Sequence, residues 1–307
     1  MVDESSYGEA EMSESMSLGA ARSWLFTPGD NPNKVEKATR TAADIILIDL
    51  EDAVAEDVKP AAREQVAAFI SAHPDQRQRL WVRVNSLHTR HLLLDLAMIV
   101  PTCPGGVMVP KINNRQELEI IDHYLSALEV ASGQSLGSIR LIIVATETPA
   151  SLFATGSYGR APRLVAMTWG AEDIATSLGA SANRREDGSY DFTYQLARSL
   201  CLAGAATAGV RAIETIHDNF RDEKGLLSIA TEACRAGFSG MLAIHPAQVE
   251  PINSAFTPSA TQVEAAKEII ELFAQHPDRG TIGYKGRMLD LPHLARAKAV
   301  YSRAGLR

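Results

Sequence analysis

Eight short apolar runs recur along the chain, and helical patterns separate most of them. The runs are rich in branched apolar residues, which is typical of parallel strands that are covered on both faces. They span Ser23–Thr27, Ile45–Leu50, Leu80–Val84, Gly106–Val109, Leu141–Ala145, Leu164–Thr168, Arg211–Ile213 and Met241–Ile244. Strands that alternate with helices form a parallel sheet, and eight such units predict an α/β fold, a closed (β/α)8 or TIM barrel.

The segments between the runs carry apolar residues at helical spacing. Lys59–Ser71 places Ala62, Val66, Phe69 and Ile70 on one face, which predicts an amphipathic helix. The same reasoning predicts helices over Asn33–Ala42, Arg115–Ser132, Tyr194–Ala208 and Leu226–Ala236. The polar segment Ser181–Asp191 lies between the sixth and seventh strands, so we expect a surface loop there whose functional role is open.

The barrel accounts for residues 20–257 and leaves a segment at each end. Residues 258–307 contain a periodic helix, Pro258–His276, a Gly-rich turn and the segment Met288–Ala304. This exceeds what a barrel needs, so we predict a C-terminal helical extension that serves as a lid or a subunit-contact arm. Residues 1–19 are rich in Ser, Glu and Met and lack the pattern of a secretory signal, which predicts a disordered acidic tail.

Composition excludes several classes of protein. The 307 residues are 46% hydrophobic and 22% charged, and no apolar run is long enough to span a bilayer, so we expect no membrane partner. The net charge of −7 argues against nucleic-acid binding but leaves room for an anionic small substrate. Cys103, Cys201 and Cys234 lack the spacing of a metal site or a disulfide framework, which predicts free thiols and a cytoplasmic protein.

Acidic residues follow two neighbouring apolar runs. Glu147 comes just after Leu141–Ala145 and before Pro149, and Asp173 comes a few residues after Leu164–Thr168. Because active sites of such barrels lie at the carboxyl ends of the strands, both carboxylates should reach one rim. Paired carboxylates at a rim predict a site for a hard cation. Taken alone, Glu147 is also compatible with an acid beside a helix start.

Other predicted strand ends add charged side chains to this rim. Arg83 lies near the carboxyl end of the third strand, and its guanidinium suits bidentate binding of a carboxylate, although a salt bridge to Glu51 would also explain it. Strand alternation places Asp49 and Glu51 on one side and Asp52 on the other. We expect Glu51 to orient Arg83 or a metal-bound water, and Asp49 to be structural.

Several motifs, in order, resemble one family. They are Arg22-Ser-Trp-Leu-Phe-Thr-Pro-Gly29, Ile48-Asp-Leu-Glu-Asp-Ala-Val54, Arg83-Val-Asn85, Pro110-Lys111, Glu147-Thr-Pro149, Gly170-Ala-Glu-Asp173 and Ala243-Ile-His-Pro-Ala-Gln248. They resemble the citrate lyase β-subunit-like family of the HpcH/HpaI aldolase superfamily, which includes malyl-CoA, citramalyl-CoA and related β-hydroxyacyl-CoA lyases. The resemblance implies a barrel that uses Mg²⁺, or Mn²⁺, to make or break a carbon–carbon bond between an acyl-CoA and a 2-oxo acid. It also implies a homotrimer or hexamer.

The resemblance implies roles for individual residues. Glu147 and Asp173 match the metal ligands, and Arg83 matches the substrate-binding arginine. Glu51, Glu172, Phe26 and Lys37 are implied to contact the substrate or CoA, or to support these contacts. His245 has no clear catalytic counterpart, and we expect a hydrogen-bonded rim histidine.

The first and last parts of the match concern CoA and the lid. Asn31 and Pro32 predict a capped helix start that can face a phosphate, and an ordinary capped helix is the alternative. The segment Gly286-Arg-Met-Leu-Asp-Leu-Pro-His293 resembles a lid motif in which an aspartate precedes proline by two positions. Asp290 then corresponds to the acid/base that acts on the thioester's α-carbon, often in a neighbouring subunit. Without the resemblance, Asp290 would be a helix N-cap.

Three alternatives to a β-hydroxyacyl-CoA lyase stay open. The chain could be a citryl-carrier-protein lyase subunit, or a malyl-CoA thioesterase in which water takes the place of the enolate. It could also bind an acyl-CoA or a 2-oxo acid without turnover. The lid motif favours free acyl-CoA, because lyase subunits that act on a carrier protein can lack it.

Overall fold

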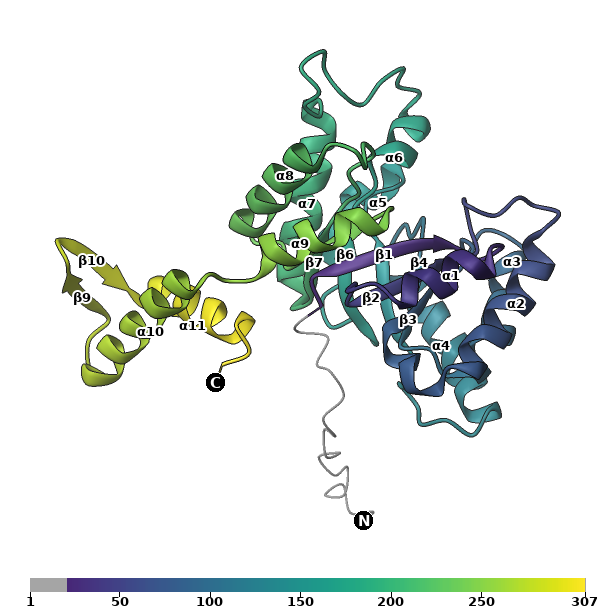
Figure 1. Cartoon of the computed structure of the whole chain (residues 1–307), viewed down its shortest axis with the longest axis horizontal. Helices are drawn as coiled ribbons and strands as arrows, with labels where there is room; N and C mark the ends of the chain where they lie inside the picture. Colours follow the sequence, from purple (N-terminus) through teal and green to yellow (C-terminus); the bar gives the residue numbers. More distant parts are fainter. Residues whose placement is uncertain (1–20, 307) are drawn as a thin grey trace.

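Eight parallel strands close into a barrel (Figure 1). The computed structural model describes residues 21–306, so the tail predicted over residues 1–19 lies outside the described part of the chain. The barrel strands are β1 (Ser23–Pro28), β2 (Ile45–Asp49), β3 (Leu80–Arg83), β4 (Gly106–Val109), β5 (Arg140–Val144), β6 (Leu164–Thr168), β7 (Arg211–Glu214) and β8 (Gly240–Ala243). β1 pairs in parallel with both β2 and β8, which closes the sheet and confirms the predicted barrel.

The helices that follow the strands surround the barrel. They are α1 (Pro32–Thr39), α2 (Lys59–Ala72), α3 (His91–Ile99), α4 (Arg115–Ala131), α5 (Pro149–Ala154), α6 (Ala171–Leu178), α7 (Phe192–Ala208), α8 (Glu223–Ala236) and α9 (Val249–Phe256). The helices α3, α5, α6 and α9 were not predicted from the sequence. The first has little amphipathic pattern, since apolar residues occupy most of its length, and the other three are short.

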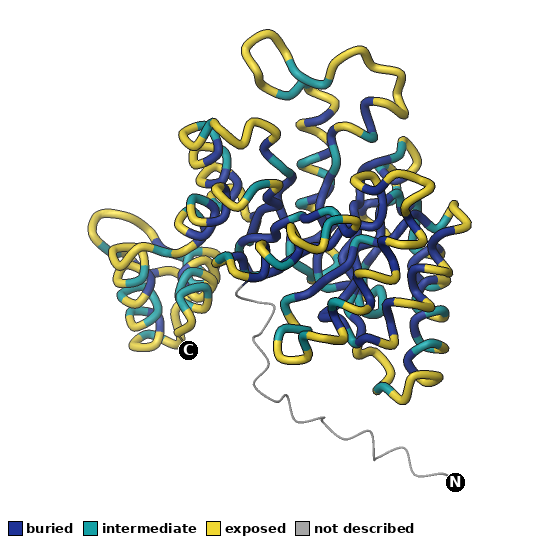
Figure 2. Tube along the Cα trace, turned by 45° about the vertical axis from the view of Figure 1, so that its right-hand side comes forward, coloured by how far each residue is buried: buried dark blue, intermediate teal, exposed yellow. Residues whose placement is uncertain are grey.

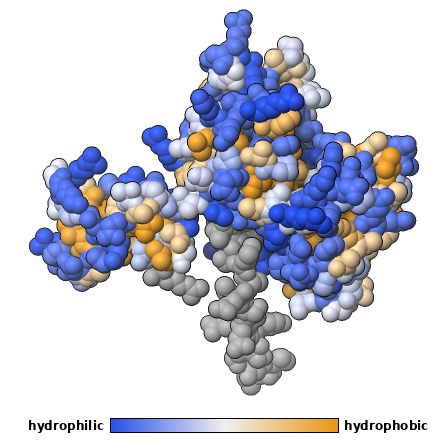
Figure 3. Space-filling model, viewed as in Figure 1, coloured by the Kyte–Doolittle hydropathy of each residue, from blue (hydrophilic) through white to orange (hydrophobic). Residues whose placement is uncertain are grey.

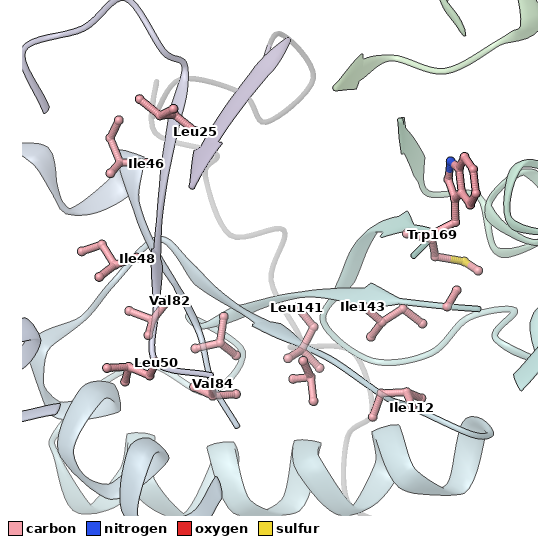
Figure 4. Packing of buried hydrophobic residues seen from close by; sticks show 14 of the residues in the cluster. Leu25, Ile46, Ile48, Leu50, Val82, Val84, Ile112, Leu141, Ile143 and Trp169 are labelled. Carbon is pink, nitrogen blue, oxygen red and sulfur yellow. The ribbon is translucent and has the colours of Figure 1, made fainter. Parts of the chain in front are cut away.

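Strand alternation sorts the apolar residues into two layers. In β2, Ile46 and Ile48 point outward into a large cluster between barrel and helices, part of which is seen in Figure 4. Ile45 and Leu47 point inward and join a second cluster with Trp81 inside the barrel. Since successive side chains face opposite sides of a strand, the inward register of β2 and β3 continues to Asp49 and Arg83. The carboxyl rim therefore receives charged residues directly above an apolar interior.

The C-terminal extension, residues 258–306, stands apart from the barrel in Figures 1 and 2. It contains α10 (Ala260–Gln275), the strands β9 (Thr281–Tyr284) and β10 (Arg287–Asp290), and α11 (Leu291–Arg303). Its own core consists of Phe273, Ile282 and Leu289 with partly buried neighbours. In Figure 2, most residues of the extension are exposed or half-buried, whereas the barrel contains many buried residues.

The extension was predicted to be helical with a Gly-rich turn, and the structure shows a β-hairpin between its two helices. Tyr284 pairs with Arg287, so Lys285 and Gly286 form a two-residue turn. Both have positive φ, 47° and 74°, which is the backbone of a type I′ turn and is favoured by glycine at the second position. The Gly-rich segment that sequence analysis treated as a simple turn therefore builds a hairpin.

Two further features agree with the composition. Cys103, Cys201 and Cys234 are free thiols, as predicted. Within residues 21–306, no helix combines the length and apolar composition needed to cross a membrane. The face of the molecule seen in Figure 3 is mostly hydrophilic, with smaller apolar areas on both the barrel and the extension.

Candidate active site

A cavity of about 480 Å³, here called the site cavity, opens at the carboxyl ends of the barrel strands. Residues at or just beyond each strand end contribute to it: Phe26, Asp49, Arg83, Met108, Val144, Trp169, Thr215 and Leu242. Glu147, Glu172 and Asp173 also line it. The predicted acidic pair and the predicted arginine thus face one space.

Glu147 is delivered to this cavity by the end of β5. It follows the strand and precedes Thr148, which caps α5 through a hydrogen bond from Ser151. Since Thr148 does the capping, the carboxylate of Glu147 is left for the rim, where its Oε2 accepts the backbone N–H of Lys111 at 2.5 Å. Glu147 does lie beside the start of α5, but Thr148 rather than Glu147 caps the helix.

Gly170, at the start of α6, lets the backbone come close to Glu147. A Cβ at position 170 would lie 3.0 Å from Cγ of Glu147 and 3.3 Å from its Oε1. Asp173 then follows in the first turn of α6 and lines the cavity. The close approach of these two segments brings both carboxylates to the same side of the cavity.

The carboxylate of Glu147 is strongly perturbed. Its side chain is only 3% exposed, and burial, together with the charges of Asp173 and Glu51, raises its pKa well above the usual value. An acid that is buried near other acids has a high free energy when it is ionised. A cation bound between Glu147 and Asp173 would relieve this cost.

Arg83 is held by two carboxylates from β2 and the loop after it. Its Nε and Nη2 donate to the two oxygens of Asp49 at 2.7 and 2.6 Å, and its Nη1 lies 3.1 Å from Oε2 of Glu51. Although burial favours the protonated acid, the charge and hydrogen bonds of Arg83 lower the pKa of Asp49. The Arg83 guanidinium also lies 4.9 Å from the centre of the Phe26 ring. Arg83 is therefore fixed in place before any ligand arrives.

Lys111 lies in one of the sequence motifs, but no role was predicted for it. Its Nζ donates to Oε1 of Glu51 at 2.6 Å and lies 3.3 Å from Oδ1 of Asp173. Lys111 has a φ of 57°, a left-handed backbone conformation at the end of β4. In this conformation Lys111 makes two contacts in the site. Its backbone N–H donates to Glu147, and its ammonium group donates to Glu51. A positive φ at a non-glycine residue cannot be read from one sequence.

Carboxylates outnumber cationic side chains in this cluster. The acids are Asp49, Glu51, Asp52, Glu147 and Asp173, and the cations are Arg83 and Lys111. Within residues 21–306, no group of three or more His, Cys, Asp or Glu side chains is arranged to hold a metal by itself. Mg²⁺ usually takes one or two protein carboxylates and completes its shell with waters and substrate oxygens. The Glu147–Asp173 pair fits that pattern.

The remaining predicted residues differ in position. Glu172 lines the cavity but is exposed, and it accepts a hydrogen bond from Asn183. Lys37 is exposed on α1 and is not among the lining residues. His245 accepts the N–H of Ala247 and is hydrogen-bonded, as expected. At α1, the capping of the helix start by Asn31, with Pro32 at its first position, is confirmed.

Asp290 lies on the extension, outside the site cavity of its own chain. It is the N-cap of α11 and accepts the backbone N–H of His293, so the helix-capping alternative describes its local contacts. The imidazole of His293 also contacts it, and this hydrogen bond lowers the pKa of Asp290. Within one chain, the structure does not bring Asp290 to the carboxylate pair.

Two aromatic side chains that line the cavity were not predicted from the sequence. Trp169, directly after β6, and Tyr190, from the loop between α6 and α7, both line the cavity and contact each other edge-to-face. Glu214, at the end of β7, is buried and accepts the indole N–H of Trp169 at 2.5 Å. The polar composition of residues 181–191 gave no signal that one ring would turn inward.

Known proteins match the chain over nearly its whole length. A family model described as HpcH/HpaI aldolase/citrate lyase matches residues 22–246. The chain is 33% identical over 291 residues to a citrate lyase subunit beta-like protein from Mycobacterium tuberculosis, with 94% of this chain and 98% of the relative covered. It is 30% identical over 301 residues to an L-malyl-CoA/beta-methylmalyl-CoA lyase from Cereibacter sphaeroides, with 92% and 94% covered.

A solved structure matches as well. It is that of protein CitE from Mycobacterium tuberculosis in complex with magnesium, acetoacetate and coenzyme A. The two structures superpose with a TM-score of 0.76 at 32% sequence identity, and the match covers 94% of this chain and 100% of the other.

Proposed function

The chain belongs to the HpcH/HpaI aldolase/citrate lyase family and is a carbon–carbon lyase, and from that premise we propose that it is a Mg²⁺-dependent lyase of β-hydroxyacyl-CoA thioesters. The products of cleavage are a 2-oxo acid and a shorter acyl-CoA. The observation that carries the proposal is that Glu147, Asp173 and Arg83 line one cavity at the carboxyl rim of the barrel. The magnesium and coenzyme A held by the similar solved structure support it.

Glu147 and Asp173 would hold the metal. The surplus of carboxylates in the cluster and the raised pKa of Glu147 are the features of this chain that fit a divalent cation. When bound, Mg²⁺ supplies Lewis-acid polarisation of the 2-oxo acid's carbonyl oxygen and stabilises negative charge there.

Arg83 binds the carboxylate of the 2-oxo acid in this proposal. A guanidinium stays charged at any working pH and offers paired donors to a carboxylate. Asp49 fixes the orientation of Arg83 by a bidentate pair, so Arg83 loses little conformational entropy when it binds the substrate carboxylate. Phe26 packs on its guanidinium, and Glu51 links Arg83 to Lys111. These residues orient the substrate and need not move.

Asp290 supplies the acid/base group, and we place it in the site of a neighbouring subunit. In the direction of cleavage it returns a proton to the α-carbon of the thioester enolate, and in the reverse direction it removes that proton. Residues 258–307 then act as the lid. This proposal explains why a motif aspartate lies away from the cavity of its own chain, and it requires an oligomer, for which we propose a homotrimer or hexamer.

Lys37 and the start of α1 are our proposed contacts for the CoA phosphates. Lys37 is exposed on α1, and the positive end of the helix dipole at the start of α1 favours an anion. Glu172, at the exposed edge of the cavity, is proposed to contact the substrate where the coenzyme enters.

A panel of CoA thioesters tests the function. We expect Mg²⁺-dependent cleavage of at least one among malyl-, citramalyl-, methylmalyl-, citryl- and hydroxymethylglutaryl-CoA. The products should be a shorter acyl-CoA and a 2-oxo acid, or a 3-oxo acid in the case of hydroxymethylglutaryl-CoA. Release of free CoA without a shorter acyl-CoA would instead identify a thioesterase. Binding of thioesters with no turnover of any of them would contradict the lyase proposal and favour a binding protein.

A further inference from the structure

The site cavity shares a wall with a second cavity. Trp169, Tyr190, Thr215 and Ile216 line both the site cavity, of about 480 Å³, and a second one of about 560 Å³. The second cavity lies beyond the wall and is lined by residues of the loop between α6 and α7, of α7 and of α8. A change in the wall would therefore alter the size of the space available to a ligand.

Tyr190 is held firmly in this wall. The Arg184 guanidinium lies 3.9 Å from the centre of the Tyr190 ring, and its Nη2 donates to the phenol oxygen at 2.8 Å. Gln195 donates to the Tyr190 carbonyl at 2.6 Å. Residues 185–189, the tip of the loop, are all exposed. The Tyr190 ring is thus clamped on its face and at its hydroxyl by Arg184 of the same loop.

Trp169, the other half of the wall, is also fixed. The two rings meet edge-to-face, with centres 5.2 Å apart and planes at 70°. Glu214 accepts the indole N–H of Trp169 at 2.5 Å and is itself held by Arg198 at 2.7 Å. Glu214 is 1% exposed, so this support is shielded from water. Two clamped aromatic rings form a rigid boundary.

The side of the site cavity next to the wall is apolar. Ile216, Leu242 and Ile244 continue the lining beyond the two rings. Arg83 is the one cationic side chain among the lining residues of the described chain, and it already pairs with Asp49. Arg184 lies against the Tyr190 ring but does not line the site cavity, so a second carboxylate on the substrate would meet the two rings rather than a counter-charge. An alkyl group would bury apolar surface there.

We propose that Tyr190 determines substrate specificity by limiting the length of an uncharged alkyl substituent on the 2-oxo acid half of the substrate. This inference rests on the proposed function, because the Glu147–Asp173 pair holds that half of the substrate in the same cavity. The preferred 2-oxo acids are monocarboxylic and carry a hydrogen or a short alkyl group. The second cavity is the space that a smaller residue at position 190 opens to a longer chain.

Binding of a homologous series tests this independently of turnover. Glyoxylate, pyruvate, 2-oxobutanoate, 2-oxopentanoate and oxaloacetate are titrated calorimetrically, with Mg²⁺ present, into the full-length wild type, Tyr190→Ala, Tyr190→Leu and Tyr190→Phe. In the wild type, 2-oxopentanoate and oxaloacetate should bind more weakly than pyruvate. Because one methylene in an apolar pocket is worth about 10–200-fold, Tyr190→Ala should raise the ratio of 2-oxopentanoate to pyruvate affinity by about 10-fold or more. Tyr190→Leu should give a smaller shift in the same direction.

Tyr190→Phe is the matched control. It keeps the ring and loses only the hydroxyl bonded to Arg184, so the wild-type order of affinities should remain. Equal weakening of all ligands in Tyr190→Ala and Tyr190→Leu, with an unchanged order, would overturn the inference and leave the lyase proposal standing. A wild type that binds none of the five acids with Mg²⁺ would overturn both. Cleavage of the corresponding CoA thioesters should follow the same order as binding.

Discussion

The barrel rim and the C-terminal extension hold their polar residues in different ways. At the rim, Glu147 is 3% exposed, and Arg83 is clamped by Asp49 above an apolar barrel interior. On the extension, the Asp290 side chain is 35% exposed, and its hydrogen-bonding partners are the backbone and imidazole of His293 in the same short segment. The rim residues are positioned by strands far apart in sequence, whereas Asp290 is positioned by its own hairpin and helix start.

The difference teaches how the proposed chemistry is divided. Binding a metal and a carboxylate requires charges that are fixed beforehand, because reorganising buried charges is costly. A rigid barrel can meet that requirement. A proton donor that must enter after the substrate can lie on an extension with its own small core, Phe273, Ile282 and Leu289, and be carried by a neighbouring chain.

Replacing Glu147 at the rim should have the largest effect. Glu147→Gln removes one charge from the proposed metal pair, and kcat/KM for the preferred thioester should fall about 10³–10⁴-fold, because Lewis-acid stabilisation is worth several kcal/mol. Mg²⁺ affinity, measured by calorimetry, should fall with it. Glu64→Gln removes the same charge from the exposed face of α2 and should change neither quantity. Unaltered Mg²⁺ dependence in Glu147→Gln would refute the metal assignment.

Replacing Asp290 on the extension should reduce turnover and spare binding. Asp290→Asn should lower kcat by about 10²–10⁴-fold, the range of general acid–base catalysis, with Mg²⁺ and pyruvate affinities unchanged. Asp278→Asn, at another exposed acid of the extension, is the control. Normal turnover by Asp290→Asn would remove the lid from the mechanism.

Mixing two inactive variants tests whether the sites are shared between subunits. When Asp290→Asn and Glu147→Gln subunits are refolded together in equal amounts, random assembly should restore about a quarter of the sites, each with an intact rim and a neighbour's intact Asp290. Activity that does not rise above that of the separate variants would argue that each chain completes its own site.

Removing Glu129 should destabilise the barrel without touching the site. Glu129 on α4 is fully buried and pairs with Arg163 at 2.6 Å. Glu129→Ala should cost about 3–5 kcal/mol in the free energy of unfolding. It removes the buried partner of Arg163, which then keeps the more exposed Asp122 as its ion-pair partner. It also removes the acceptor of the backbone N–H groups of Gly137 and Ile139. Glu119→Ala, which breaks the exposed Arg115–Glu119 pair on the same helix, should cost about 0.5 kcal/mol or less. Equal losses in urea denaturation would contradict the role of burial.

The Glu129 pair should also make the barrel sensitive to acid. Burial alone would raise the pKa of Glu129, but hydrogen bonds from Arg163 and from backbone amides lower it below the usual 4.5. The folded state therefore binds the proton less readily than the unfolded state. The stability that this group contributes is complete above pH 4.5 and is lost as the pH falls toward its lower folded-state pKa. The difference in unfolding free energy between wild type and Glu129→Ala should shrink accordingly on acidification.

A small change in the core of the extension should have the least effect. Ile282→Val should weaken the hairpin by about 0.5–1.5 kcal/mol, measured as faster amide hydrogen exchange in β9 and β10. Mg²⁺ affinity at the rim should not change. Faster exchange that also spread through the barrel strands would show that the two regions unfold as one unit.

Parts of the site were accessible to sequence reasoning because they depend on local pattern. An apolar strand followed by an acid places Glu147 at the rim, and the alternation of β3 places Arg83 there. The double role of Lys111 was not predictable, since it depends on a left-handed residue after β4. Tyr190 was also missed, because a polar loop gives no periodic signal of which ring turns inward.

The sequence by itself determined the eight-stranded α/β barrel, the strands that carry the rim charges and the family. Strand and helix periods are local, so they can be read from a single chain. Only the tertiary structure decided that Asp49 rather than Glu51 is the bidentate partner of Arg83, that Tyr190 separates two cavities, and that Asp290 lies outside its own chain's site. Those facts depend on contacts between segments that are far apart in the sequence, and a local sequence pattern does not predict such contacts.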